Sequence, residues 1–471
     1  MTTKRLATIL VLTLIAGCGG GPRNGDDDRS CDPAAPACAE GLVCAEVLEG
    51  EPRCVGPVVI RGRVLDLATD EPIAGALVQA VDVNGAAVGT SVATDEEGAF
   101  TLTVPVVRDA EDAPADGAFT LRVQAAAYQE FPTAIRPALP LDATTATAEE
   151  NGWVIDNPLT TVKLIPLPGD SANWGSISGT ISAEWNAGVL VVAEGAGRAF
   201  TGFSDGEGRY TIFNVPAGAY TVQAYAAGLQ VDAASTSLEV GEAVDDIDLM
   251  ESDRPLSTVS GNVQIVNAPG GSRTSIVLAL ESTFVEASGR GTVPPGLRVG
   301  DIEGTFTIDD VPDGSYVVLA AFENDALVRD PDQTIGGTEI VRITVPDPGA
   351  GNVVTLPEGF KVTGALAVVS PGADAPEEIN TPTPTLTWED DSSEEGYEIH
   401  VFDAFGNEVW SDEIGPTSGS ATVSHVYAGP ALEHGMFYQF RITSFREREE
   451  ERTAISTTED LKGVFFFLSN S

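Results

Sequence analysis

Positively charged residues are scarce in this chain of 471 residues, which has 25 Lys and Arg against 71 Asp and Glu. The formal net charge of −46 opposes the approach of nucleic-acid phosphates and of anionic lipid headgroups, so neither is expected as an electrostatic partner. Histidine is limited to three residues, and the motifs of zinc peptidases, phosphate-binding loops and EF-hand loops are missing. These absences disfavour nucleic-acid-binding proteins and the common metal- and nucleotide-dependent enzymes.

Cysteine is absent after residue 54. Apart from Cys18, the chain has four cysteines, which lie close together at Cys31, Cys38, Cys44 and Cys54. An even number of cysteines in a short exported segment predicts two disulfides, with three pairings that the sequence does not distinguish. A zinc site is the alternative, and it is disfavoured because no two of these residues form a Cys-x-x-Cys pair. We therefore expect a small disulfide-rich segment over residues 31–54.

Hydrophobic runs of membrane-spanning length are missing as well. The apolar run near the amino terminus, residues 6–16, follows a short basic head and ends just before Gly17-Cys18. This arrangement resembles the signal peptide of bacterial lipoproteins, in which the cysteine becomes the first residue of the mature chain and carries the lipid. An ordinary cleaved signal with an incidental cysteine is the alternative.

The lipoprotein resemblance implies a signal peptide over residues 1–17, lipid attachment at Cys18 and a flexible tether over residues 18–30. Gly19 follows the cysteine, where an Asp would imply retention in the inner membrane, so the resemblance points to the outer membrane. The remaining chain would lie in the periplasm or at the cell surface, held to the membrane by its lipid alone.

The chain does contain a repeated pattern of glycine, proline and alternating apolar residues. Residues 205–222 read Asp-Gly-Glu-Gly-Arg-Tyr-Thr-Ile-Phe-Asn-Val-Pro-Ala-Gly-Ala-Tyr-Thr-Val, and the same offsets recur from residue 301. The alternation predicts two strands joined by a tight turn, and the Asp-x-x-Gly that precedes them predicts a further turn. An earlier copy begins at Asp95, and its acidic insertion over residues 108–116 is expected to lengthen a hairpin loop. A repeated cassette of this kind predicts β-sandwich modules in tandem.

A family resemblance rests on residues 62–64, 72–76 and 95–100, together with Tyr128. They resemble the carboxypeptidase regulatory-like module, a transthyretin-like β-sandwich. The resemblance implies three such sandwiches, over residues 57–168, 175–250 and 257–357. In that family the module accompanies a zinc peptidase domain, which is not found here. The Gly- and Pro-rich residues 288–300 of the third copy are expected to form a surface loop.

Residues 366–471 carry a different pattern. A strand ending in Trp388 is followed by Leu432, Gly435 and Tyr438 at a spacing that resembles the tyrosine corner of fibronectin type III domains. Residues 464–468 should form the last strand, in which one of three successive Phe faces solvent or a neighbour. The predicted fold is therefore all-β, with three transthyretin-like sandwiches and one fibronectin-like sandwich arranged as independent beads.

Two patterns resemble catalytic or metal-binding motifs but lack the features that such sites need. Residues 202–206 match the Gly-x-Ser-x-Gly motif of hydrolases, but a strand follows where the motif needs a helix, so we do not expect Ser204 to be a nucleophile. The three histidines, His400, His425 and His434, are expected to be incidental surface residues rather than metal ligands.

Calcium is the one cofactor candidate. Asp95, Asp205 and Asp301 head equivalent turns, each with a Glu two residues further on, and carboxylate oxygens are ligands that Ca²⁺ prefers. The alternative is structural, because Asp at the head of a turn accepts the backbone N–H groups of that turn.

Glycan binding requires exposed aromatic faces. Trp153, Trp174 and Trp185 are expected in loops or linkers and are the candidates, although they could instead seal the junctions between modules. The aromatic residues of the repeated cassette are expected in the cores: Tyr210, Phe213, Tyr220, Phe306 and Tyr316.

Together, these patterns predict a non-enzymatic lipoprotein that presents or spaces a binding surface in the cell envelope. A carbohydrate-binding protein is one alternative, and an accessory subunit of an envelope or secretion assembly is the other.

Overall fold

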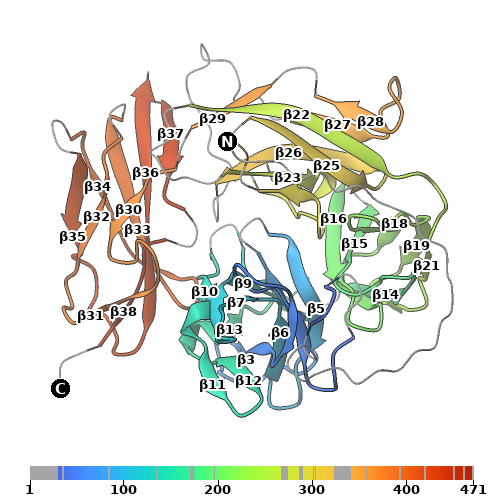
Figure 1. Cartoon of the computed structure of the whole chain (residues 1–471), viewed down its shortest axis with the longest axis horizontal. Coiled ribbons are helices and arrows are strands. Elements are labelled where there is room, and N and C mark those ends of the chain that lie inside the picture. Colours follow the sequence, from blue (N-terminus) through green and yellow to red (C-terminus); the bar gives the residue numbers. More distant parts are fainter. Residues whose placement is uncertain are drawn as a thin grey trace, which may run out of the picture.

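The computed structural model is an all-β chain of tandem β-sandwiches (Figure 1). It describes residues 30–33, 37–82, 85–133, 136–169, 174–195, 197–266, 274–285, 290–300, 302, 304–322, 341–356, 359–363, 365–391, 394–417, 421–448, 451–459 and 462–468. None of these residues belongs to a helix that is long and apolar enough to cross a membrane. Cys18, the signal peptide, the tether up to residue 29 and Asp301 lie outside the described residues.

The first sandwich is built around the central strand β3, whose alternation of buried and exposed residues is as predicted. Ile60 and Val64 are fully buried, whereas Arg61 and Arg63 on the other face are exposed. One sheet consists of β11 (Thr147–Glu149), β12 (Gly152–Ile155), β3 (Val58–Asp66), β13 (Thr161–Leu164) and β6 (Ala99–Val104). The facing sheet consists of β10 (Leu141–Asp142), β9 (Ala118–Gln124), β4 (Leu77–Val81) and β5 (Ala87–Ala93).

The second sandwich repeats this topology around β14. One of its sheets consists of β17 (Arg209–Val215), β14 (Gly175–Ser182), β20 (Ala243–Val244) and β21 (Leu249–Met250). The other consists of β16 (Arg198–Phe203), β15 (Leu190–Gly195), β18 (Gly218–Tyr225) and β19 (Ala234–Leu238). The central strand needs glycine where its short parallel neighbours approach, since a Cβ on Gly179 would lie 2.1 Å from the carbonyl oxygen of Ile247.

The third sandwich has the same arrangement around β22. One sheet consists of β25 (Thr305–Val311), β22 (Ser257–Val266), β28 (Val353–Thr355) and β29 (Phe360–Thr363), and the other of β24 (Arg298–Val299), β23 (Thr274–Leu280), β26 (Gly314–Phe322) and β27 (Val341–Val345). Because β29 pairs with β22, this sandwich continues past the expected end at residue 357.

The expected surface loop over residues 288–300 is wrong for the part of it that the structure describes. Val293 and Leu297 are almost completely buried, and β24 at its end pairs with β23. The high Gly and Pro content led to the prediction of a surface loop, but the side chains of Val293 and Leu297 pack this segment against the core of the third sandwich.

The repeated cassette does not form a hairpin, contrary to the prediction. β17 pairs with β14, whereas β18 pairs with β15 and β19 in the opposite sheet. The turn at Pro216 therefore carries the chain across the sandwich, and the corresponding strands of the other two copies are separated in the same way. The alternation did not reveal this, because both strands bury every second residue in one core whichever sheet they join.

The last sandwich differs in topology from the other three. One of its sheets consists of β30 (Val368–Ser370), β32 (Thr385–Glu389) and β35 (Thr422–Val426). The other consists of β31 (Glu377–Ile379), β38 (Val464–Phe467), β36 (Phe437–Arg448), β33 (Gly396–Asp403) and β34 (Glu408–Ile414), and β37 (Glu451–Thr457) pairs with β36. Trp388 is fully buried, and the hydroxyl of Tyr438 accepts a hydrogen bond from the N–H of Glu433 at 2.8 Å. Phe466 alone among the three successive Phe is partly exposed, and it stacks on Phe437.

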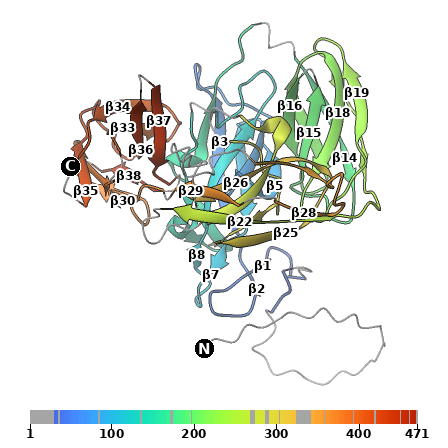
Figure 2. The same ribbon diagram turned by 90° about the horizontal axis from the view of Figure 1, so that it is seen from above.

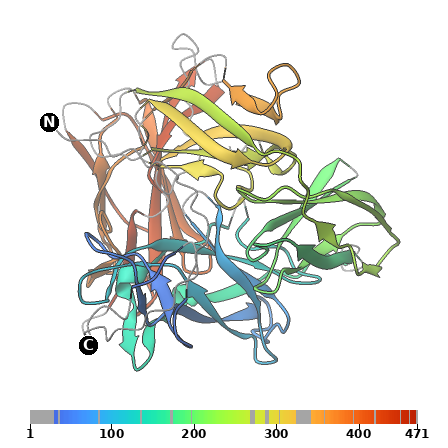
Figure 3. The same cartoon turned by 45° about the vertical axis from the view of Figure 1, so that its right-hand side comes forward.

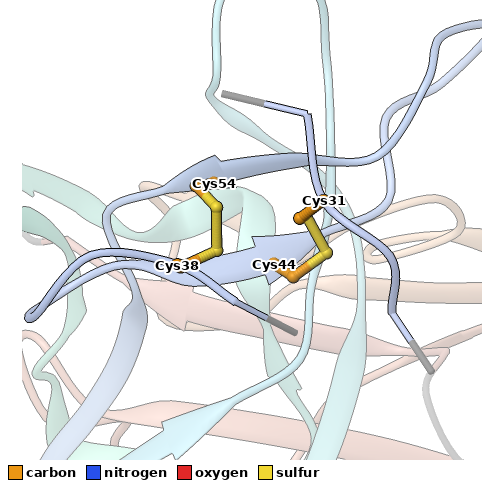
Figure 4. The surroundings of a disulfide bond; sticks show 4 residues. All are labelled: Cys31, Cys38, Cys44 and Cys54. Atoms are coloured by element: carbon orange, nitrogen blue, oxygen red, sulfur yellow. A yellow bond between two sulfur atoms is a disulfide. The ribbon is translucent and has the colours of Figure 1, made fainter. Parts of the chain in front are cut away.

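The four cysteines between residues 31 and 54 form two disulfides, and the structure decides their pairing. Cys31 is bonded to Cys44 on strand β1 (Val43–Ala45), and Cys38 to Cys54 on strand β2 (Arg53–Val55), and the two strands pair with each other (Figure 4). Three of the sulfurs lie within 4.8 Å of one another, which is also the geometry of a metal cluster, but the disulfide bonds occupy them.

The disulfide-rich segment docks on the acidic insertion of the first sandwich, next to its short strands β7 (Val107–Arg108) and β8 (Pro114–Asp116) (Figure 2). Arg53 forms an ion pair with Asp112 at 2.6 Å and donates to the carbonyl oxygen of Ala110 at 2.8 Å. Arg108 is buried and donates to the carbonyl oxygen of Gly56 at 2.9 Å. The insertion thus forms a short hairpin of its own, in which β7 pairs with β8, and the disulfide-rich segment packs on it. It does not lengthen a hairpin between β6 and β9, because these two strands belong to opposite sheets.

The sandwiches are not independent beads, contrary to the prediction. The second sandwich lies beside the first, with the third across both (Figure 3). Ala86 and Ala87 of the first sandwich belong to hydrophobic clusters of the third, and Phe203 and Tyr225 of the second join the same core. Ala404 of the last sandwich belongs to the core of the first. All three later sandwiches thus bury apolar side chains against a neighbour, which the local sequence pattern could not show.

Candidate functional site: a cleft between the first two sandwiches

The junction of the first two sandwiches is held by Asn214, at the end of β17. Its backbone is in the left-handed region with φ 57°. Its side-chain amide donates to the carbonyl oxygens of Ala125 and Tyr128, both at 2.9 Å, and its Oδ1 accepts the N–H of Ala127 at 2.9 Å. One Asn side chain thereby satisfies three backbone groups of the neighbouring sandwich, which fixes the two bodies relative to each other.

A second set of contacts joins β9 to the edge strand β16. Gln124 donates to the carbonyl oxygen of Thr201 at 2.9 Å, and the Arg122 guanidinium bonds the hydroxyl of Thr201 and lies 4.9 Å from the centre of the Phe203 ring. Arg122 also pairs with Glu130 within its own sandwich. These contacts join strands that are separated by more than seventy residues in the chain.

A cleft of about 200 Å³ opens beside this junction. Four aromatic side chains line it: Tyr128, Trp174, Phe200 and Phe213. All four are partly exposed, and Phe200 also packs on the core of the second sandwich in edge contact with Tyr220. The cleft thus has aromatic walls from both sandwiches, including Trp174, which directly precedes β14.

The polar lining of the cleft comes from amides, one carboxylate and the hydroxyl residue Thr201. Gln124, Gln129, Glu130 and Asn214 contribute, and Glu130 is balanced by its pairing with Arg122 and by a hydrogen bond from Gln124 at 3.1 Å. The hydroxyl of Tyr128 donates to Oδ2 of Asp66 at 3.1 Å. Partial burial, followed by this hydrogen bond, raises the pKa of Tyr128, so its ring stays neutral at physiological pH.

The three predicted glycan-binding tryptophans lie at three different places. Trp174 lines the junction cleft. Trp153 is on strand β12 and not in a loop as expected; it lines a second cleft, of about 570 Å³, beneath the disulfide-rich segment. Trp185 lies in a turn with 49% of its surface exposed. The structure therefore does not bring the three together.

Phe213 is the residue of the cleft that sequence reasoning placed wrongly, since it was expected in a core. Tyr210 and Ile212 point into the core of the second sandwich, and Phe213 takes the opposite face of the same strand. The alternation of buried and partly exposed residues along β17 was sufficient to place Phe213 outside the core. The corresponding positions in the other two copies hold Thr103 and Asp309, so the aromatic residue is specific to this junction.

In the turns that were candidates for calcium binding, the aspartate carboxylates accept hydrogen bonds from the backbone of the same turn. Oδ1 of Asp205 accepts the N–H groups of Glu207 at 2.8 Å and of Arg209 at 3.0 Å, and its Oδ2 pairs with the Arg209 side chain at 2.9 Å. Oδ1 of Asp95 accepts the N–H groups of Glu97 and Ala99. Both carboxylates have a structural role in their turns.

Ser204, His400 and His425 form no catalytic group in the part of the chain that the structure describes. Ser204 is fully buried; its hydroxyl donates to the carbonyl oxygen of Asn186 and accepts the N–H of Val189 at 2.8 Å. His400 bonds Glu408 and His425 bonds Asp412, each on the surface of the last sandwich.

No protein-family model and no curated protein matches this chain. Solved structures to which it is similar include the Bacillus anthracis TIE protein, at 11% identity over 87% of this chain and 73% of that chain, with a TM-score of 0.15. A DUF3823 family protein from Bacteroides ovatus is 12% identical over 45% of this chain and 99% of its own, with a TM-score of 0.21. The major pilin subunit of Bacillus cereus is 12% identical over 63% and 98%, with a TM-score of 0.17. These scores are too low to bear on function.

Proposed function

We propose that this chain is a lipid-anchored, non-enzymatic protein of the bacterial cell envelope that presents a binding surface on a rigid set of β-sandwiches. The observation that carries the binding role is the cleft at the first junction, where partly exposed aromatic and amide side chains meet on strands fixed by Asn214. A concave site with aromatic walls and a few polar groups is the usual form of a binding site.

Two features of the described residues support a role without catalysis. The Gly-x-Ser-x-Gly serine is buried in a structural hydrogen-bond network, and His400 and His425 pair with surface carboxylates. Nucleophilic catalysis needs a nucleophile and a base within hydrogen-bond reach, and neither candidate has such a partner.

The family assignment within this proposal is that the first three sandwiches are carboxypeptidase regulatory-like modules and the last is a fibronectin type III domain. The shared topology around β3, β14 and β22 supports the first part. The buried Trp388 and the bond between Tyr438 and the backbone of Glu433 support the second, because a tyrosine corner makes this type of contact.

The membrane anchor is tested by the variant Cys18→Ala in the producing cell. We expect the parent in the outer-membrane fraction and the variant in the soluble fraction, because one residue carries the lipid. Labelling with a radioactive fatty acid should mark the parent alone. An unlabelled parent, or equal fractionation of the two proteins, would contradict the anchor.

The binding role is tested by crosslinking the parent and Trp174→Ala in intact envelopes. We expect the parent to be crosslinked to an envelope component, whether glycan or protein, and the variant to lose that product while it keeps its membrane location. Crosslinking that does not depend on Trp174 would contradict the cleft as the binding surface, and a protein product would favour an accessory subunit of an envelope assembly.

A further inference from the structure

We infer that the junction cleft binds one ring of a neutral oligosaccharide. This inference rests on the proposed function, because it names the class of ligand for the same cleft. It combines four observations: the aromatic walls of the cleft, its size, its hydrogen-bonding groups and its charge.

The aromatic walls suit the apolar C–H faces of a sugar ring. Trp174 and Phe213 keep part of their surface exposed in the cleft, and neither belongs to one of the hydrophobic core clusters. Aromatic side chains provide a large contact area at little cost in conformational freedom, and indole adds an N–H donor at its edge. Trp174 and Phe213 are therefore the residues that would stack on the ligand.

The size of the cleft limits the ligand. Its volume of about 200 Å³ is smaller than the roughly 300–1,000 Å³ that is typical of sites for drug-sized molecules. A single ring fits this space, and the open side of the cleft lets further units of a chain continue into solvent.

The polar groups of the cleft match hydroxyls that both donate and accept. The Gln124 side-chain N–H groups are used by Glu130 and Thr201, and its Oε1 has no hydrogen bond among the described residues. The exposed Gln129 side chain likewise has no hydrogen-bond partner in the part of the chain that the structure describes. Both amides can therefore bond a ligand without breaking a contact within the protein.

The charge of the cleft favours a neutral ligand. Among the described residues, no Lys or Arg belongs to the lining of the cleft, so a phosphate or carboxylate ligand would meet Glu130 with no cation in that lining. Glu130 is itself balanced by Arg122, which leaves no spare negative charge for a cationic ligand. A quaternary ammonium ion in the aromatic walls is the competing ligand class, and the experiment distinguishes it.

The test is calorimetric titration of the full-length mature protein, carrying Cys18→Ala for solubility, with neutral oligosaccharides of hexose and N-acetylhexosamine units and, separately, with choline. We expect saturable binding of at least one oligosaccharide and none of choline. Trp174→Ala and Phe213→Ala should each weaken binding by about tenfold or more, since aromatic anchors dominate small interfaces. Trp185→Ala, which removes an exposed tryptophan away from the cleft, should bind as the parent does.

Thermal unfolding of each variant controls for misfolding, and Trp174→Phe, which retains a stacking face, should recover part of the affinity. The inference is overturned if no oligosaccharide binds, if choline binds in their place, or if binding survives both cleft substitutions. Loss of the envelope crosslink in Trp174→Ala, with no sugar bound by the parent, would overturn this inference and leave the proposed function standing.

Discussion

The side-chain amide of Asn214 donates to the carbonyl oxygen of Tyr128 at 2.9 Å, across 86 residues of sequence. This bond connects the end of β17, the first strand of the repeated cassette in one sandwich, to the turn that follows the last long strand of the preceding sandwich. The corresponding turn of the second sandwich contacts the third sandwich: the N–H of Gly228 donates to the carbonyl oxygen of Asp310 at 2.8 Å. Equivalent residues thus meet at the two junctions, through the side chain of Asn214 at the first and through the backbone of Asp310 at the second.

We predict that Asn214→Ala destabilises the junction of the first two sandwiches by about 2 kcal/mol or more. The substitution leaves the carbonyl oxygen of Tyr128 and the N–H of Ala127 without this partner, whereas the carbonyl oxygen of Ala125 keeps the N–H of Tyr128 at 3.3 Å. Each polar group left unpaired costs about 1–3 kcal/mol when it is buried. Alanine is also disfavoured at φ 57°. Urea unfolding measures the loss. Asn214→Gly removes the same three bonds but carries no backbone strain at φ 57°, so a glycine variant as stable as the parent would refute the role of the amide.

Gly208→Val should cost more than about 1 kcal/mol, because Gly208 has φ 78° and a Cβ there would lie 2.5 Å from Nδ2 of Asn186. Gly206→Val in the same turn is the matched control, since the nearest atom to its Cβ is 4.0 Å away. Melting temperatures of the two variants, compared with the parent, test the turn. Equal loss in both variants would contradict it.

Peptide mapping of the unreduced protein should find Cys31 linked to Cys44 and Cys38 linked to Cys54. Replacing either pair by Ser should destabilise the segment over residues 31–54 by about 3 kcal/mol, since each bridge closes a loop of about 15 residues. The first sandwich has its own core, so its melting should change much less. A link between Cys31 and Cys38 would contradict the structure.

Arg136→Met should uncouple the last sandwich from the first. Nη2 of Arg136 donates to the carbonyl oxygens of Lys163 at 2.9 Å and Phe405 at 2.7 Å, and burial lowers its pKa. Methionine fills similar space but leaves both oxygens without a donor. Calorimetry should resolve a separate, earlier transition for the last sandwich in the variant. If the variant unfolds in one transition at the same temperature as the parent, the Arg136 contact does not couple the first and the last sandwich.

The alternation of apolar residues was sufficient to predict the strands. Ile60 and Val64 face a core and Arg61 faces solvent because side chains on a strand alternate between its two faces. The same rule places Phe213 on the face of β17 opposite Ile212. The prediction was wrong because it assumed that every aromatic residue of the repeated cassette is buried. The number of cysteines likewise predicted two disulfides but not which sulfurs meet.

The sequence alone determined the fold class, the turns and the repeated module, because these depend on residues a few positions apart. Only the tertiary structure decided which sheet each strand of the cassette joins, how the disulfides pair and that the sandwiches pack together. Those outcomes depend on contacts such as Asn214 with Ala125, 89 residues apart, for which no local pattern exists. The cleft beside this contact exists for the same reason, since its walls come from two sandwiches that meet only in the folded chain.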